Sequence, residues 1–145
     1  MTLKRYAEAV WTGDLQSGQG ALTTPQSGLF DAQPYSFKTR FGDAKGTNPE
    51  ELLAAAHAGC FSMALSAMLG QQGFAVEAIQ SRAEVSMDPG MQPGPTITGI
   101  RLIVSARVPG IDVARFEAIA GQAKAGCVIS RALSVPVTLQ ANLIE

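Results

Sequence analysis

Three short stretches near the start of the chain read as strands: residues 5–11, which alternate loosely between apolar and polar, residues 20–24, and residues 35–41, which alternate clearly. Period-two alternation is typical of a strand with one buried face, and glycine-containing turns separate the stretches. In the third stretch the aromatic residues share one face and Arg40 lies on the other. The pattern therefore predicts three short strands, with Arg40 on a half-buried strand.

An apolar, alanine-rich segment follows, from residue 49 to about residue 71. Asn48 can cap a helix here because its side-chain oxygen can accept a free backbone N–H, and Pro49 suits the first helical position. Gly70 or Gly73 is expected to end the helix. The many small residues of the segment would let another backbone approach closely. We interpret it as the central, buried helix of the fold.

The second half of the chain predicts two longer strands, a helix, a short helical turn and a final strand. The strands span residues 75–88, 96–108 and 135–144, and Asp112 starts the helix. The full order is βββ-α-ββ-α-α-β. Runs of strands without regular βαβ units favour an α+β fold, with antiparallel sheets wrapped around the central helix. The length of 145 residues fits one domain, residues 1–145.

Charged residues make up only 16% of the chain, and the net charge is −1. The sparse charge suggests that a second copy of the chain covers part of the surface. No basic patch stands out, so we do not expect a nucleic-acid partner.

The chain begins with charged residues but has no apolar run behind them, so we expect no secretory signal. The longest apolar stretch, residues 52–69, is interrupted by His57, Gly59 and two serines. It is therefore a poor candidate for a membrane span. A cytoplasmic location without membrane contact is the expectation.

The two cysteines, Cys60 and Cys127, are the candidate reactive groups. Cys60 lies within the apolar helix, where a thiol has a raised pKa unless a positive charge such as that of Arg40 comes near. Cys127 follows Gly126 at a junction of two helices, and a helix start lowers the pKa of a thiol. Inert packing of either cysteine is the alternative.

His57 precedes Cys60 by three residues, so the two share a helix face. A Cys–His pair can activate a nucleophile, but a single histidine on an apolar helix is more often a core residue. One histidine and two cysteines do not make a zinc site, and no phosphate-binding glycine loop is present. We expect no metal and no other cofactor.

Several stretches of the sequence share the pattern of one known family. In the first half they are Gln33-Pro34-Tyr35, Thr39-Arg40-Phe41, Gly46-Thr47-Asn48-Pro49-Glu50-Glu51-Leu52 and Ala55-Ala56-His57-Ala58-Gly59-Cys60-Phe61-Ser62-Met63-Ala64-Leu65. In the second half they are Val108-Pro109-Gly110-Ile111 and Lys124-Ala125-Gly126-Cys127. Over nearly its whole length the chain resembles the OsmC/Ohr family of osmotically inducible and organic-hydroperoxide-resistance proteins, and its OsmC branch in particular. One departure is Val128, where many members have proline.

The resemblance implies a thiol peroxidase that acts on organic hydroperoxides, and less efficiently on hydrogen peroxide, in oxidative or osmotic stress. It implies that Cys60 attacks the hydroperoxide and becomes a sulfenic acid, which Cys127 resolves to a disulfide. Arg40 matches the arginine that holds the thiolate, and Glu50 matches the glutamate that orients this arginine. A dithiol, possibly on a lipoyl protein, would restore the two thiols.

The resemblance also implies an intertwined homodimer with active sites at the subunit interface. Helix geometry favours the same arrangement, because ten residues of helix separate Glu50 from Cys60 by about 15 Å. We therefore expect the Glu50 of one chain to serve the Cys60 of its partner. Two alternatives stay open at this point: a redox sensor or binding protein with slow turnover, and a structural dimer in which both cysteines only pack.

Overall fold

The computed structural model describes residues 1–144 of the chain. It separates into two units, Met1–Leu52 and Leu53–Glu145, each with its own strands. The first unit holds an antiparallel sheet of order β1-β2-β3, made of Glu8–Thr12, Gln19–Thr23 and Gln33–Tyr35. Gly20 pairs with Tyr35, and a Cβ atom at Gly20 would lie 2.3 Å from the Tyr35 ring, so this position excludes larger residues. The first two predicted strands are therefore present, whereas the third strand lies earlier than predicted and shares only Tyr35 with the range 35–41.

The prediction of a strand over residues 35–41 is wrong beyond Tyr35, because a short helix, α1 (Phe37–Phe41), follows β3. Ser36 begins this helix with a capping box: its Oγ accepts from the Thr39 N–H, and Thr39 Oγ1 accepts from the Ser36 N–H. These two bonds satisfy backbone donors that a strand would pair elsewhere. The strand pattern also predicted Arg40 on the face opposite the aromatic residues. In the structure the Arg40 guanidinium lies 5.0 Å from the centre of the Phe41 ring, so the two side chains are on the same side.

The long helix α2 spans Pro49–Gln71, as the sequence predicts. Asn48 Oδ1 accepts from the Glu51 N–H at 2.9 Å and so caps the helix. The helix is buried along one line of residues four positions apart: His57, Phe61, Leu65 and Leu69. Met63, away from this line, is 77% exposed. In a single chain the expected central helix is thus buried on one side only.

The length and hydropathy of α2 would also allow it to cross a membrane. A core helix of a folded domain can have the same properties. The buried line of α2 packs in a hydrophobic core with strand β5 and helix α3, so its apolar character has a structural explanation within the chain.

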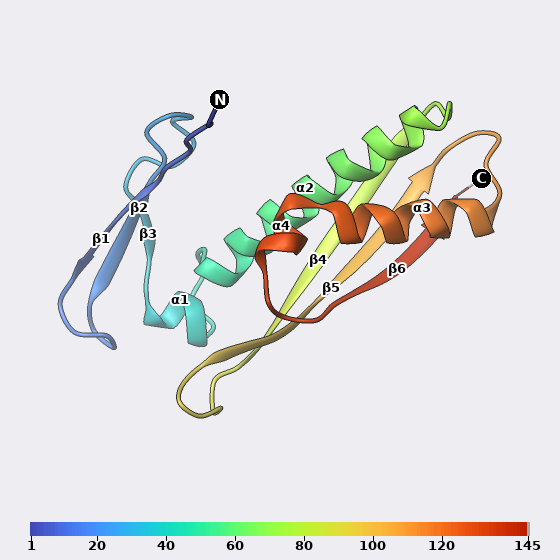
Figure 1. The fold of residues 1–145 in the computed structure, drawn as a ribbon. Helices are drawn as coiled ribbons and strands as arrows, with labels where there is room; N and C mark the ends of the chain where they lie inside the picture. The colour runs from blue at the N-terminus through green and yellow to red at the C-terminus, as the bar shows by residue number, and fades with distance from the viewer. Residues whose placement is uncertain (145) are drawn as a thin grey trace. The chain divides into compact units, whose positions relative to one another are not determined.

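The second unit combines a three-stranded sheet with helices on one face (Figure 1). Its strands are β4 (Ala78–Asp88), β5 (Thr96–Arg107) and β6 (Val137–Leu143), and its further helices are α3 (Val113–Gly126) and α4 (Val128–Ala132). Alternate residues of β5 are buried: Ile100, Leu102, Val104 and Ala106. Asp112 caps α3 by accepting from the Arg115 N–H, as the sequence predicts for the start of this helix.

The sheet of the second unit is mixed, which corrects the expectation of antiparallel sheets only. β4 pairs with β5 antiparallel, whereas β6 runs parallel to β5, with Ile100 opposite Val137. Parallel strands need a long crossover, and helices α3 and α4 form it between β5 and β6. The α+β class is confirmed, but the last strand takes the direction that its helical connection requires.

Candidate active site

Two sulfur atoms from distant parts of the sequence meet in the second unit. Cys60 lies on α2 and Cys127 lies between α3 and α4, and their Sγ atoms are 3.0 Å apart. Both residues are free thiols. The structure therefore brings together two of the four residues that the sequence suggested as catalytic, at a distance where one sulfur can attack the other with little movement.

Cys127 reaches this position because the helical path breaks at its backbone. Its N–H donates to the carbonyl of Ala123, the last turn of α3, and its carbonyl accepts from the Arg131 N–H of α4. The residue has extended ψ (130°), so it ends one helix and begins the next. This bend places the Cys127 side chain between α4 and the middle of α2.

The two thiols differ in access. Cys127 is 1% exposed, whereas Cys60 is partly exposed and lines a hollow of about 560 Å³. The other lining residues are small or apolar: Ala56, Met63, Ala64, Gly126, Val128 and Ile129, with Cys127 at the base. A small apolar molecule that enters this hollow therefore meets the sulfur of Cys60.

The two thiols also differ in acidity. Burial raises the pKa of Cys60, and its hydrogen bond with Cys127 raises it further. Burial acts on Cys127 in the same direction, but the hydrogen bond with Cys60 and the polar hydrogens of Ser130 and Ile129 outweigh it and lower the pKa of Cys127. The contact between the two sulfurs therefore raises the pKa of the accessible thiol and lowers that of the buried one.

The remaining two candidates form an ion pair in the first unit. Arg40 Nη2 lies 2.7 Å from Glu50 Oε1, and Arg40 Nε lies 3.1 Å from both carboxylate oxygens. Burial alone would raise the pKa of Glu50, but hydrogen bonds from Arg40 leave it below its usual value. The same bonds raise the pKa of Arg40. The fork of Arg40 is thus held by a carboxylate while the Arg40 side chain stays 36% exposed.

His57 is fully buried, and its Nε2 lies 2.7 Å from Ser130 Oγ. This contact joins α2 to α4 one helical turn away from the sulfur pair. Burial lowers the pKa of His57, so the imidazole is neutral near pH 7. Ser130 was not singled out from the sequence, and the only signal available there was its spacing of three residues from Cys127.

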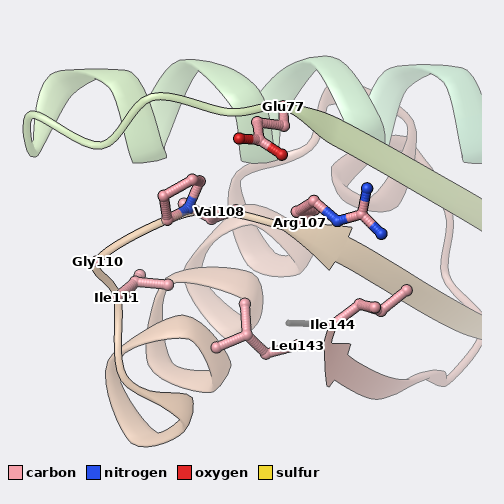
Figure 2. A pocket seen from close by; sticks show the side chains of 8 residues that line it. Glu77, Arg107, Val108, Gly110, Ile111, Leu143 and Ile144 are labelled. Carbon is pink, nitrogen blue, oxygen red and sulfur yellow. The ribbon is translucent and has the colours of Figure 1, made fainter.

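Another hollow, of about 320 Å³, lies at the end of the second unit's sheet where β4 begins and β5 and β6 end (Figure 2). Val108, Pro109, Gly110 and Ile111 form one side of it. No cysteine or histidine lines this hollow, so the family-like stretch at 108–111 shapes the loop before α3 rather than the sulfur site. Within residues 1–144, no three His, Cys, Asp or Glu side chains gather as metal ligands would.

Comparisons with known proteins agree on one family. Residues 42–141 match the family model described as OsmC-like protein. The chain is 48% identical to Peroxiredoxin OsmC of Escherichia coli (strain K12), over 99% of both chains. It is 35% identical to an organic hydroperoxide resistance protein of Xanthomonas axonopodis pv. citri, over 65% of this chain and 66% of the relative.

A solved structure has the same fold. The crystal structure of an OsmC-like protein from Mycoplasma pneumoniae superposes with a TM-score of 0.77 and covers all of both chains, at 14% identity. With a family model that spans most of the chain and a relative that is nearly half identical from end to end, this protein belongs to the OsmC-like family.

Proposed function

We propose that this protein is a thiol peroxidase that reduces organic hydroperoxides, and hydrogen peroxide less efficiently, in defence against oxidative or osmotic stress. The observation that carries the proposal is the contact between Cys60 and Cys127, with Sγ atoms 3.0 Å apart and Cys60 as the more exposed of the two thiols that line an apolar hollow. The names of the relatives, a peroxiredoxin and an organic hydroperoxide resistance protein, support the same activity.

In the first half of the reaction, the Cys60 thiolate attacks the terminal oxygen of the hydroperoxide. The O–O bond breaks, the OH group stays on Cys60 as a sulfenic acid, and the alkoxide leaves as the alcohol after it takes up the proton that the Cys60 thiol released. Cys127 then attacks the Cys60 sulfur, so that a disulfide forms and water leaves. The apolar lining of the hollow favours an organic substituent over the bare hydrogen of hydrogen peroxide.

Arg40 and Glu50 complete the proposed site. Burial holds Cys60 protonated in the second unit, so its thiolate needs a cation. An arginine keeps its charge when it is desolvated, and Glu50 already orients the guanidinium of Arg40. We assign Arg40 to the Cys60 thiolate and the polarised peroxide, and Glu50 to the position of Arg40.

The proposed assembly is an intertwined homodimer in which Arg40 and Glu50 of one chain serve Cys60 of its partner. The rise of an α-helix supports this, since ten residues of α2 span about 15 Å between Glu50 and Cys60. Exposure supports it as well: all five residues of β1 are exposed in the single chain, including Val10 and Trp11, and a second copy could cover these apolar side chains. Together the two units would form one OsmC-like domain that works in the cytoplasm.

The second half of the reaction returns the disulfide to two thiols at the expense of a dithiol. A lipoyl group on a protein is the proposed physiological donor, since its two thiols can close a ring as they are oxidised. No metal and no organic cofactor is needed for either half of the cycle.

A thiol titration with cumene hydroperoxide tests the function. One equivalent should remove both thiols of each chain rapidly, and a dithiol should restore them. Cys60→Ser should abolish turnover, whereas Cys127→Ser should stop at a sulfenic acid on Cys60, detected with dimedone. Ser134→Ala, at an exposed serine, serves as the control.

Other outcomes would point elsewhere. Rapid oxidation with poor recovery would indicate a redox sensor, and thiols that stay unreactive would indicate a structural role. Full activity of Cys60→Ser would overturn the roles assigned to the two cysteines.

A further inference from the structure

Beside the sulfur pair, one further polar contact joins helix α2 to helix α4. His57 Nε2 lies 2.7 Å from Ser130 Oγ. His57 lies three residues before Cys60 on α2, and Ser130 lies three residues after Cys127, which directly precedes α4. Among the residues that the structure describes, no other side-chain hydrogen bond joins these two helices. The attack of Cys60 on a hydroperoxide makes no use of this contact.

The imidazole of His57 depends on Ser130 for its polar contact. His57 is fully buried, and its Nδ1 has no hydrogen-bond partner within residues 1–144. Removal of Ser130 Oγ would therefore leave both ring nitrogens without a partner in the described part of the chain. A buried polar group without a partner is costly, because nothing replaces the water that it has lost. The contact therefore favours the arrangement in which α4 lies against α2.

Few other contacts fix the position of α4. This helix has five residues, no side chain caps its start, and none of its residues is fully buried. Ile129 is the α4 residue that packs against the hydrophobic core. The carbonyl of Cys127 accepts from the Arg131 N–H, so the backbone of Cys127 is joined to this helix. A shift of α4 would therefore be transmitted to Cys127.

We propose that the contact between His57 and Ser130 holds Cys127 beside Cys60, so that Cys127 resolves the sulfenic acid on Cys60 before a second hydroperoxide oxidises it further. The inference rests on the proposed function and deepens its resolution step. The two Sγ atoms are 3.0 Å apart, and a disulfide bond of about 2.05 Å needs an approach of only about 1 Å from this position. His57 and Ser130 are thus positioning residues that act through Cys127.

Two reactions compete for the sulfenic acid. In resolution, the Cys127 sulfur bonds to Cys60 Sγ while the S–O bond breaks, and the hydroxide leaves as water with the proton of the Cys127 thiol. In the competing reaction, a second hydroperoxide transfers its terminal oxygen to Cys60, which becomes a sulfinic acid, and the alcohol leaves. Cys60 lines the hollow, so this second molecule can reach it. The position of Cys127 then decides which reaction prevails.

An equilibrium with glutathione tests the positioning without any hydroperoxide. The full chain is equilibrated in mixtures of reduced and oxidised glutathione, and the ratio of dithiol to disulfide gives the effective concentration of one thiol at the other. Ser130→Ala should lower this effective concentration about tenfold, as expected for one lost buried hydrogen bond. An unchanged value would contradict the proposal and show that packing of Ile129 is enough to hold α4.

Oxidation by cumene hydroperoxide tests the consequence for the reaction. In Ser130→Ala the first thiol of each chain should be lost at the wild-type rate, whereas the second should be lost about tenfold more slowly. Mass spectrometry should find more dimedone-labelled Cys60, and more sulfinic acid when the hydroperoxide is in excess. Equal slowing of both thiols would show a general structural role and overturn the proposal. If no thiol reacts in the wild type, the proposed function fails, whatever the glutathione equilibrium shows.

Three further variants make the test specific. Ser130→Thr, which keeps the hydroxyl, should restore the effective concentration. Ser62→Ala is the matched control, because it removes a partly buried hydroxyl of α2 that bonds to Ala58 and Ser81 and not to α4; it should behave as the wild type in both experiments. His57→Leu should behave as Ser130→Ala does, and if it does not fold, Ser130→Ala and its threonine counterpart decide. Failure of Ser130→Thr to restore the effective concentration would contradict the role of the hydroxyl.

Discussion

At the scale of single residues, the two thiols are placed so that the accessible one is the weaker acid. Burial and the contact with Cys127 raise the pKa of Cys60, while the contact with Cys60 and the polar hydrogens of Ser130 outweigh burial and lower the pKa of Cys127. A reactive Cys60 thiolate therefore depends on a cation from outside this cluster. The fork of Arg40, already held by Glu50, has the geometry and the permanent charge for that task.

Arg40→Lys tests whether the bidentate geometry of the Arg40 guanidinium matters for the oxidation of Cys60. Lysine keeps the charge but loses the bidentate geometry, so the rate of Cys60 oxidation by cumene hydroperoxide should fall about 10- to 100-fold, the equivalent of one or two charge-assisted hydrogen bonds. Stopped-flow measurement of thiol loss gives the rate. Arg82→Lys, at an exposed surface ion pair with Glu84, is the control and should leave the rate of Cys60 oxidation unchanged. A lysine variant as fast as the wild type would remove Arg40 from the site.

The ion pair also has a pH signature. The pKa of Glu50 in the folded protein lies below its ordinary value, so the pair adds stability above about pH 4.3, the usual carboxyl pKa. This contribution is lost as the pH falls through the lower, folded pKa. The partly exposed pair is worth about 1 kcal/mol or less. Urea unfolding of wild type and Glu50→Gln should therefore differ near pH 7 and converge near pH 3. Glu51→Gln, in the same turn of α2, controls for the loss of one charge, and a constant difference at all pH values would contradict the prediction.

At the scale of elements, the short helix α1 shows where a local pattern misleads. Alternation over seven residues predicts a strand, but the bonds between Ser36 and Thr39 turn the chain into a helix after Tyr35. The consequence reaches the proposed site, because α1 and not a strand presents Arg40. By contrast, α2 carries its own strong signals, with Asn48 and Pro49 at its start, and the predicted bounds agree with the structure.

Ser36→Ala should measure the cap of α1. Loss of the side-chain acceptor should lower the free energy of unfolding by about 1 kcal/mol, the usual value of a helix cap. Urea unfolding followed by circular dichroism gives the change, and the exposed Ser134→Ala should stay within about 0.5 kcal/mol of wild type. If Ser36→Ala is as stable as this control, the cap does not hold α1.

At the scale of the whole molecule, the sparse charge and the exposed apolar residues of the single chain favour a second copy as cover. Val10 and Leu15 in the first unit are 65% and 62% exposed, and Met63 and Val128 beside the sulfur hollow are 77% and 63% exposed. Burial of Met63 and Val128 between copies would also shield the hollow around Cys60 from solvent. Light scattering at micromolar concentration should therefore report a dimer. A fully active monomer would exclude the shared site.

Mixed dimers test whether two chains share each active site. Arg40→Ala and Cys60→Ser should each be inactive as separate proteins. When the two variants are produced together, half of the dimers should be mixed, and each mixed dimer should contain one complete site. Activity should therefore return to about a quarter of the wild-type rate under random pairing. If the mixture stays inactive although mixed dimers are isolated by affinity tags, each site belongs to a single chain.

Local signals in the sequence were enough for the α+β class, the bounds of α2, the cap at Asp112 and the family to which the chain belongs. These features depend on neighbouring residues, whose periodicity and capping chemistry can be read along the chain. The direction of β6, the helix at Arg40, the 3.0 Å contact between Cys60 and Cys127, and the contact between His57 and Ser130 required the folded chain. Proximity and acidity are set by groups that approach from distant segments, and in the sulfur pair those groups come from positions 67 residues apart.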